Sequence, residues 1–176
     1  LVLGRDNRGD AGVTPETEAG NQLAGIDIRV SNNWFGTPVA FYVSGTAEDE
    51  AGGFPSKYML QGGIEGSGYI RSRWSYRWFL EIASNSCDAL KSTPVYNCAY
   101  NNELYQTGYR YYGRSVGHGS ENDARIGSLG IILSDTEATT WQFLVRTGDL
   151  NRGGDPDSRN TLTPTPQEIM SADIRF

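Results

Sequence analysis

The residues best equipped for binding chemistry cluster between positions 109 and 125. This stretch combines arginines and tyrosines with two carboxylates and the only histidine of the chain. Glycan sites use aromatic faces against the apolar side of a sugar ring, and guanidinium forks pair with acidic sugar groups through two parallel hydrogen bonds. We therefore predict polysaccharide contacts, preferably with an acidic glycan, at Arg110, Tyr111, Tyr112, Arg114, His118, Asp123 and Arg125.

A second interpretation of the same stretch is structural. It could form a strand of a barrel wall, with its arginines neutralising Asp123 and Glu121 inside the wall. On such a strand Tyr111 and Tyr112 would point to opposite faces, so at most one of them could stack on a sugar. Composition alone favours this structural interpretation over a glycan site.

Catalysis finds little support in the sequence. His118 lies near Ser115 and Asp123, but a histidine close to a serine is a common arrangement. The acidic run 48–50 is interpreted as an exposed loop, and the DPD segment 155–157 as a turn that lacks the ligand count of a calcium loop. We expect no enzymatic activity, no metal site and no cofactor.

The two cysteines, Cys87 and Cys98, lie in one long polar segment. An even count at short separation in an exported protein predicts a disulfide, and two free thiols are the alternative. No CxxC pair or His/Cys cluster suggests a metal centre.

Composition limits the class of protein. The chain has 176 residues, 15 basic and 21 acidic side chains and a net charge of -6, so it is one domain or part of one and is not expected to bind nucleic acid. Ten Tyr, six Phe and four Trp argue against disorder. No run approaches 18 apolar residues, which excludes a transmembrane helix but not a membrane β-barrel.

Strict alternation of apolar and polar residues recurs along the chain in segments of about ten residues. This length suits a tilted membrane strand, although the apolar face of a soluble sandwich gives the same alternation. The expected strands lie near 24–30, 39–48, 57–65, 74–83, 129–133, 141–146 and 170–176, with a stub at 1–3. We predict that Ala24, Ile26, Ile28, Trp78, Leu80, Leu129, Ile131, Trp141 and Phe143 face outward into lipid.

Aromatic residues and connection lengths favour the membrane alternative. Aromatic girdles anchor barrels at the headgroup level, and the aromatic residues at or near strand ends are Trp34, Phe35, Trp74, Tyr76, Trp141 and Phe176. Long connections (4–21, 85–123 and 151–166) and a moderate one (49–56) alternate with short ones (31–38, 66–72 and 135–138). An up-and-down barrel with long extracellular loops and short periplasmic turns has this pattern, and it places the C-terminus on the periplasmic side.

Six segments together resemble the capsule assembly Wzi family of Gram-negative outer membranes. They are NQLAGID (21–27), EDEAG (48–52), PSKYM (55–59), LEIASNSC (80–87), YRYYGRSVGH (109–118) and NDAR (122–125). The resemblance implies an all-β, antiparallel up-and-down transmembrane β-barrel of about eighteen strands. Residues 1–176 would then be the C-terminal portion of that single barrel domain, because the chain is too short to form it all.

The resemblance also implies a lectin-like function. Such a protein would bind capsular or other surface polysaccharide and tether it to the cell, in the outer membrane, with its loops facing the exterior. Its partners would be the polysaccharide and outer-membrane lipid or lipopolysaccharide, and we expect a monomer. The alternatives are an outer-membrane porin and a soluble β-sandwich carbohydrate-binding module.

Overall fold

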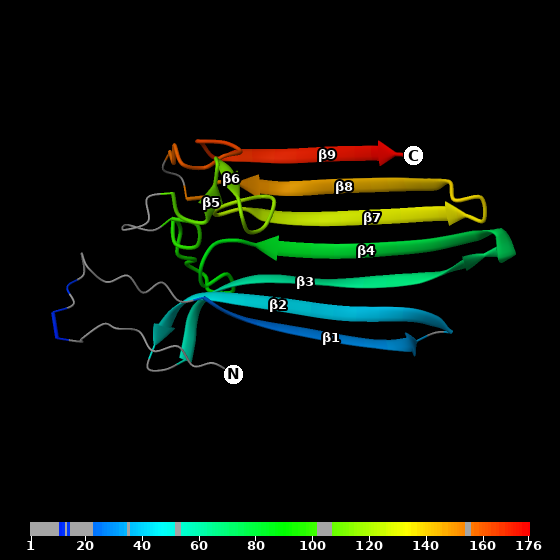
Figure 1. The fold of residues 1–176 in the computed structure, drawn as a ribbon, viewed down its shortest axis with the longest axis horizontal. Helices are drawn as coiled ribbons and strands as arrows, with labels where there is room; N and C mark the ends of the chain where they lie inside the picture. Colours follow the sequence, from blue (N-terminus) through cyan, green and yellow to red (C-terminus); the bar gives the residue numbers. More distant parts are fainter. Residues whose placement is uncertain are drawn as a thin grey trace.

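The alternating segments form one antiparallel sheet (Figure 1). The computed structural model describes residues 11, 12, 14, 23–34, 36–51, 54–101, 107–153 and 156–176. Seven strands pair in the order β1-β2-β3-β4-β7-β8-β9. Their bounds are β1 (Ala24–Trp34), β2 (Thr37–Ala51), β3 (Phe54–Ile70), β4 (Trp74–Ser84), β7 (Arg125–Asp135), β8 (Thr140–Leu150) and β9 (Gln167–Arg175). The predicted all-β, antiparallel architecture is confirmed.

Cross-strand pairing gathers apolar side chains on one face of this sheet. In one lateral row Phe41 pairs with Ile64, Ile64 with Leu80, and Leu80 with Leu129. Because side chains alternate along each strand, all nine positions predicted to face outward share this surface, here called the apolar face. The opposite surface, here called the polar face, carries Asp27, Arg29, Tyr42, Glu65, Arg77, Glu81, Arg146 and Asp173.

The apolar face lies open. Ile28, Val43 and Leu80 are each more than half exposed. In a sandwich this face would pack against a second sheet. Within the described part of the chain no second sheet covers it.

Aromatic residues form a band at one end of the apolar face. Trp34 packs against Phe41, and Trp141 stacks on Phe176, each pair with ring centroids 5.3 Å apart. Trp74, which pairs with Asp135, begins β4 at the same end. Phe35, which was predicted to join this band, lies outside the described residues.

The short connections and the C-terminus share one end of the sheet, as predicted, and the long segments lie at the other (Figure 1). At the short end β3 and β4 are joined by η1 (Arg71–Arg73). The moderate loop expected at 49–56 is wrong, because β2 continues to Ala51 and β3 begins at Phe54. The acidic run 48–50 therefore lies in a strand rather than in a loop. The stub at 1–3 and most of the loop at 4–21 lie outside the described residues.

Among the described residues no helix is both long and apolar enough to cross a membrane.

The two long segments pack together over one end of the polar face. We call the described residues of 85–124 and 151–166 the cap. Met59, on the polar side of β3, packs against a small core of Cys87, Ala99 and Tyr100 in the cap. A second small core joins Ala124, Ile126 and Leu150 at the base of the cap. The cap thus covers the end of the polar face that is opposite the short turns.

Candidate functional site

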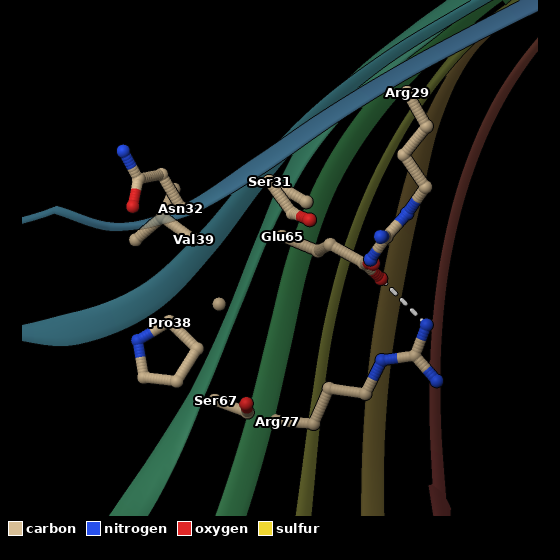
Figure 2. A pocket seen from close by; sticks show the side chains of 10 residues that line it. Arg29, Ser31, Asn32, Pro38, Val39, Glu65, Ser67 and Arg77 are labelled. Carbon is tan, nitrogen blue, oxygen red and sulfur yellow. Dashed lines mark hydrogen bonds and ion pairs between the residues drawn. The ribbon is translucent and has the colours of Figure 1, made fainter.

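The polar face carries a cluster of charged side chains on β1, β3 and β4 (Figure 2). Glu65 bridges Arg29 and Arg77, pairing with each through one of its two carboxylate oxygens. The Glu65 side chain is 13% exposed, whereas both arginines are more than half exposed. A hollow of about 460 Å³ lies beside these side chains. The arrangement leaves guanidinium edges open to solutes on this face.

Further polar contacts lie on the same face. The Tyr42 hydroxyl and the Gln61 amide each donate to the Glu81 carboxylate, at 2.7 Å. Arg146 of β8 pairs with Asp173 of β9 at 3.0 Å. Along the described strands the polar face therefore carries side chains of both charges rather than of one sign.

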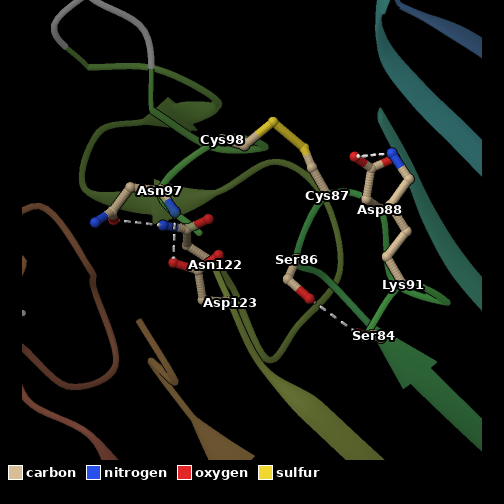
Figure 3. Close-up of a disulfide and its surroundings, with 9 residues drawn as sticks. All are labelled: Ser84, Ser86, Cys87, Asp88, Lys91, Asn97, Cys98, Asn122 and Asp123. Atoms are coloured by element: carbon tan, nitrogen blue, oxygen red, sulfur yellow. Dashed lines mark hydrogen bonds and ion pairs between the residues drawn. A yellow bond between two sulfur atoms is a disulfide. The ribbon is translucent and has the colours of Figure 1, made fainter. Parts of the chain in front are cut away.

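A disulfide between Cys87 and Cys98 closes the first half of the cap (Figure 3). Val95 and Cys87 exchange backbone hydrogen bonds inside this loop. Next to it, the Asn97 backbone N–H donates to the Asp123 carboxylate at 2.8 Å, and the Asn122 amide donates to Asn97 Oδ1 at 3.2 Å. The disulfide and these bonds hold the two ends of segment 85–124 together.

Removing the disulfide is expected to loosen the cap while leaving the sheet intact. In the chain-entropy model a loop of this length gives about 3 kcal/mol of stabilisation. Cys87→Ala/Cys98→Ala should therefore lower the opening free energy of residues 85–124, measured by hydrogen exchange, by about that amount. Alkylation of both thiols in the unreduced wild-type protein would contradict the pairing.

Arg110 is an internal cap residue. Its guanidinium pairs with Glu121, and both side chains are at most 5% exposed. Arg110 also donates to the Tyr100 carbonyl at 3.1 Å and to Asn101 Oδ1 at 2.8 Å. Glu121 accepts in turn from the backbone N–H of Thr161, which ties the two halves of the cap together. The structure therefore gives Arg110 the internal neutralising contact that the structural interpretation expected.

Asp123 is fully buried, and the cause of its altered acidity is desolvation. Burial raises the pKa of this carboxyl to about 6, although the Asn97 N–H and Arg152 oppose the rise and Asp157 adds to it. Asp157 itself has a lowered pKa: burial raises it, but the bonds from Asn101 and Arg159 outweigh that effect. Asp123 thus carries a costly negative charge at neutral pH inside the cap.

We expect Asp123→Asn to stabilise the cap at pH 8. An acid whose pKa is higher in the folded state stabilises the fold while it is protonated, and this stability is lost as pH rises from 3.8 through about 6. The neutral amide keeps the acceptor for Asn97 N–H, and asparagine tolerates the local φ of 55°. The gain should reach up to about 3 kcal/mol at pH 8 and vanish near the ordinary pKa. Hydrogen exchange of cap amides, corrected for intrinsic rates, measures this gain in stability at pH 8 and near the ordinary pKa. An equal gain at the two pH values would contradict the argument that the gain comes from removing a buried charge.

Tyr111 and Tyr112 do not lie on a wall strand. β5 (Arg110–Tyr111) and β6 (Arg114–Ser115) form a separate two-stranded hairpin in the cap. Tyr112 and Gly113 occupy its turn with φ of 48° and 69°, the left-handed pair of a type I′ turn. The prediction that the two tyrosines point to opposite faces is wrong, because the turn brings their rings edge to face at 4.6 Å. Both rings are exposed, at 70% and 89%, and Arg114 beside them is exposed too.

His118 is half-buried beneath the hairpin. Its Nδ1 accepts from the Ser120 backbone N–H at 3.2 Å, and its own backbone N–H donates to the Tyr100 hydroxyl at 2.7 Å. Burial lowers the pKa of the ring, against a smaller opposing effect of Glu81. The ring therefore gains its positive charge only at a lower pH than an ordinary histidine does.

The serine, histidine and acid noted in the sequence do not assemble into a catalytic triad. Residues 113–117 (GRSVG) fit the pattern G-x-S-x-G, but they form a hairpin turn and strand rather than a strand-to-helix elbow. Ser115 Oγ donates to the His118 carbonyl at 3.4 Å rather than to its ring. The Asp123 carboxylate lies against Asn97.

Arg125 lies apart from the other predicted contacts. It begins β7 on the apolar face, paired with Ser84 and with Asp149. The structure thus brings Tyr111, Tyr112 and Arg114 together at the surface and His118 beneath them, while Arg110 and Asp123 are internal. Among the described residues no group of His, Cys, Asp or Glu side chains is placed to hold a metal ion.

A pocket that the sequence did not indicate lies between the cap and the polar face. Its volume is about 280 Å³. The sheet contributes Ser44, Thr46, Met59 and Gln61, and the cap contributes Asn85, Tyr100, Tyr109, Val116 and His118. These residues come from two strands, β2 and β3, and from widely separated positions of segment 85–124, so no local motif could have grouped them.

Comparison with known proteins places the chain in a family. The family model of the capsule assembly protein Wzi matches residues 2–176. A solved structure of Wzi from Escherichia coli, an outer-membrane protein involved in group 1 capsule assembly and described as a carbohydrate-binding β-barrel, matches 88% of this chain with a TM-score of 0.78 and 27% identity.

A curated relative from Klebsiella pneumoniae, an uncharacterised 55.8 kDa protein of the cps region, is 39% identical over 79 residues, which is 44% of this chain. The chain spans 34% of the solved structure and 14% of this relative. The match of the family model, over nearly the whole chain, shows that the chain belongs to the capsule assembly protein Wzi family.

Proposed function

We propose that this protein binds capsular or other surface polysaccharide and tethers it to the cell. The observation that carries the proposal is the shared fold with a carbohydrate-binding β-barrel over most of the chain. The cap supports it, because a disulfide-closed structure at the long-loop end gives a polymer a fixed surface to bind. We propose binding without catalysis.

The exposed tip of the hairpin suits the polymer contact. Tyr111 and Tyr112 offer two rings at right angles, and an aromatic ring can cover the apolar side of a sugar. Arg114 beside them offers an always-charged fork for an acidic sugar group. Of the residues predicted from the sequence, these three are the ones that we propose as surface contacts, with His118 contributing from below.

The two unpaired edges of the sheet support a place for this chain in a larger membrane barrel. β1 and β9 are the edges of the seven-stranded sheet, and unpaired strand edges are not tolerated in lipid. We propose that residues 1–176 belong to one larger barrel domain of about eighteen strands in the outer membrane. The apolar face would contact lipid and lipopolysaccharide, the cap would face the exterior, and the protein would act as a monomer.

Retention of polysaccharide by cells tests the function. A strain lacking the full-length protein should shed polysaccharide into the medium, and the wild-type gene should restore a surface layer seen by immunofluorescence. Tyr111→Ala/Tyr112→Ala should weaken retention about thirtyfold, since each of the two aromatic contacts contributes roughly 1 kcal/mol. Leu90→Ser is the matched control, because Leu90 is an exposed cap residue away from the hairpin. Equal retention with and without the protein would contradict the proposal.

A further inference from the structure

The pocket between the cap and the polar face has two chemically different walls. The sheet wall presents the hydroxyls of Ser44 and Thr46 and the amide of Gln61. The cap wall presents Tyr100 and Tyr109. A volume of about 280 Å³ lies just below the range of roughly 300–1,000 Å³ typical of pockets for drug-sized ligands. The pocket therefore has room for one sugar unit, and not for several.

The described lining carries no formal charge. Among the described residues that line this pocket there is no Asp, Glu, Lys or Arg, whereas the hollow beside Glu65 is lined by Arg29 and Arg77. His118, the one titratable residue besides the tyrosines, is neutral near pH 7 because burial lowers its pKa. Burying an ion without a partner is costly, so the pocket favours an uncharged ligand.

Polar and apolar groups are mixed in the way that a sugar ring requires. Gln61 uses its Nε2 to donate to Glu81, so its carbonyl oxygen remains as an acceptor. His118 accepts at Nδ1, which places the proton of the neutral ring on Nε2 as a donor. Tyr100, Tyr109 and Met59 add apolar surface. A neutral pyranose presents hydroxyls at its rim and C–H groups on its faces, and matches both kinds of surface.

The cap wall is fixed in place before any ligand arrives. The Tyr100 hydroxyl accepts from His118 N–H at 2.7 Å, and Asn85 Nδ2 donates to the Glu121 carbonyl at 2.7 Å. Gly117 permits this contact, because a Cβ there would lie 2.4 Å from the Tyr100 hydroxyl oxygen. A pre-formed wall reduces the entropy lost on binding.

We propose that this pocket, between Ser44, Thr46 and Gln61 of the sheet and Tyr100 and His118 of the cap, binds one neutral sugar unit. The inference rests on the proposed polysaccharide binding in that the sugar is a unit of the bound polymer, held beneath the hairpin tip. Neutral hexoses bind here in preference to uronic acids, because the described residues of the lining offer no cation to an acidic group.

Two variants test the pocket in the full-length protein. Thr46→Leu fills the pocket from the sheet side. His118→Asn keeps an acceptor for Ser120 N–H but removes the ring edge with Nε2. Leu90→Ser again serves as the control. The probes are glucose, galactose and mannose, with glucuronate as the charged comparison, and binding is measured by saturation-transfer NMR on the detergent-solubilised protein. Retention of the polymer by cells is measured separately for each variant.

We expect at least one neutral hexose to bind the wild-type protein and Leu90→Ser, and its signal to fall at least tenfold in both pocket variants. Equal binding by Thr46→Leu and the wild-type protein would overturn the pocket site, as would binding of glucuronate alone or of no probe. These outcomes are separable from the proposed function. If cells with the wild-type protein retain no polymer although the hexose signal depends on Thr46, the tethering function is contradicted and the pocket site is not. If cells with each variant retain as much polymer as cells with the wild-type protein, the tethering function is supported and the pocket site is contradicted.

Discussion

Leu80→Arg is expected to destabilise the protein by about 2–4 kcal/mol in a phospholipid bilayer, the cost of an arginine on the lipid face of a barrel near the membrane midplane. Leu80 lies in the middle of β4 on the apolar face, with Ile64 and Leu129 as its direct cross-strand neighbours. Leu80 is more than half exposed, so the arginine meets no steric obstacle. The loss of stability therefore measures whether the apolar face is surrounded by lipid or by water. The free energy of unfolding from urea titration in lipid vesicles measures it.

Ser128→Arg is the matched control. Ser128 pairs directly with Glu81, one position along from the Leu80–Leu129 pair and therefore on the opposite face. An arginine there enters a surface already populated by paired charges, near the Glu81 carboxylate, and should cost less than about 1 kcal/mol. Equal costs for Leu80→Arg and Ser128→Arg would contradict the assignment of the apolar face to lipid.

Arg110→Ala is expected to destabilise the cap by about 3–5 kcal/mol, because the substitution leaves the Glu121 carboxylate buried without its counter-ion. The loss should appear as faster hydrogen exchange in both halves of the cap, since Glu121 also accepts from Thr161. The sheet strands should keep their protection. Polysaccharide retention would then fall through loss of the cap structure, without any direct contact between Arg110 and the glycan.

Two further variants separate this structural effect from binding. Arg110→Met/Glu121→Gln removes both charges, retains an acceptor for Thr161 and should recover most of the lost stability. Arg114→Ala changes an exposed side chain of the same hairpin and should alter cap stability by no more than about 0.5 kcal/mol. If Arg110→Ala left cap exchange at the wild-type rate, the buried pair would not be the structural element described here.

The sheet could be predicted from the sequence alone. Alternation along residues 74–83 was enough to locate β4 and to assign Leu80 and Glu81 to opposite faces, because a two-residue period leaves only two ways for a strand to lie. The same reasoning located all seven strands. It underestimated the length of β2, β3, β7 and β8. In β2 and β3 the reason is that the acidic run 48–50 has low strand propensity, which pairing with a neighbouring strand overrides.

Which of the polar loop residues are buried and which are exposed follows from the tertiary structure and not from local sequence. Arg110 and Arg114 are four residues apart in one segment of uniform composition, yet one pairs with a buried glutamate and the other is exposed. Nothing local distinguishes them, because the difference comes from Glu121, which folds back against Arg110, and from Thr161 in another loop. The pocket likewise exists only where Thr46 and Gln61 of the sheet meet Tyr100 and His118 of the cap. Strand faces follow from spacing along the chain, whereas this site depends on contacts between segments far apart in sequence, which spacing does not encode.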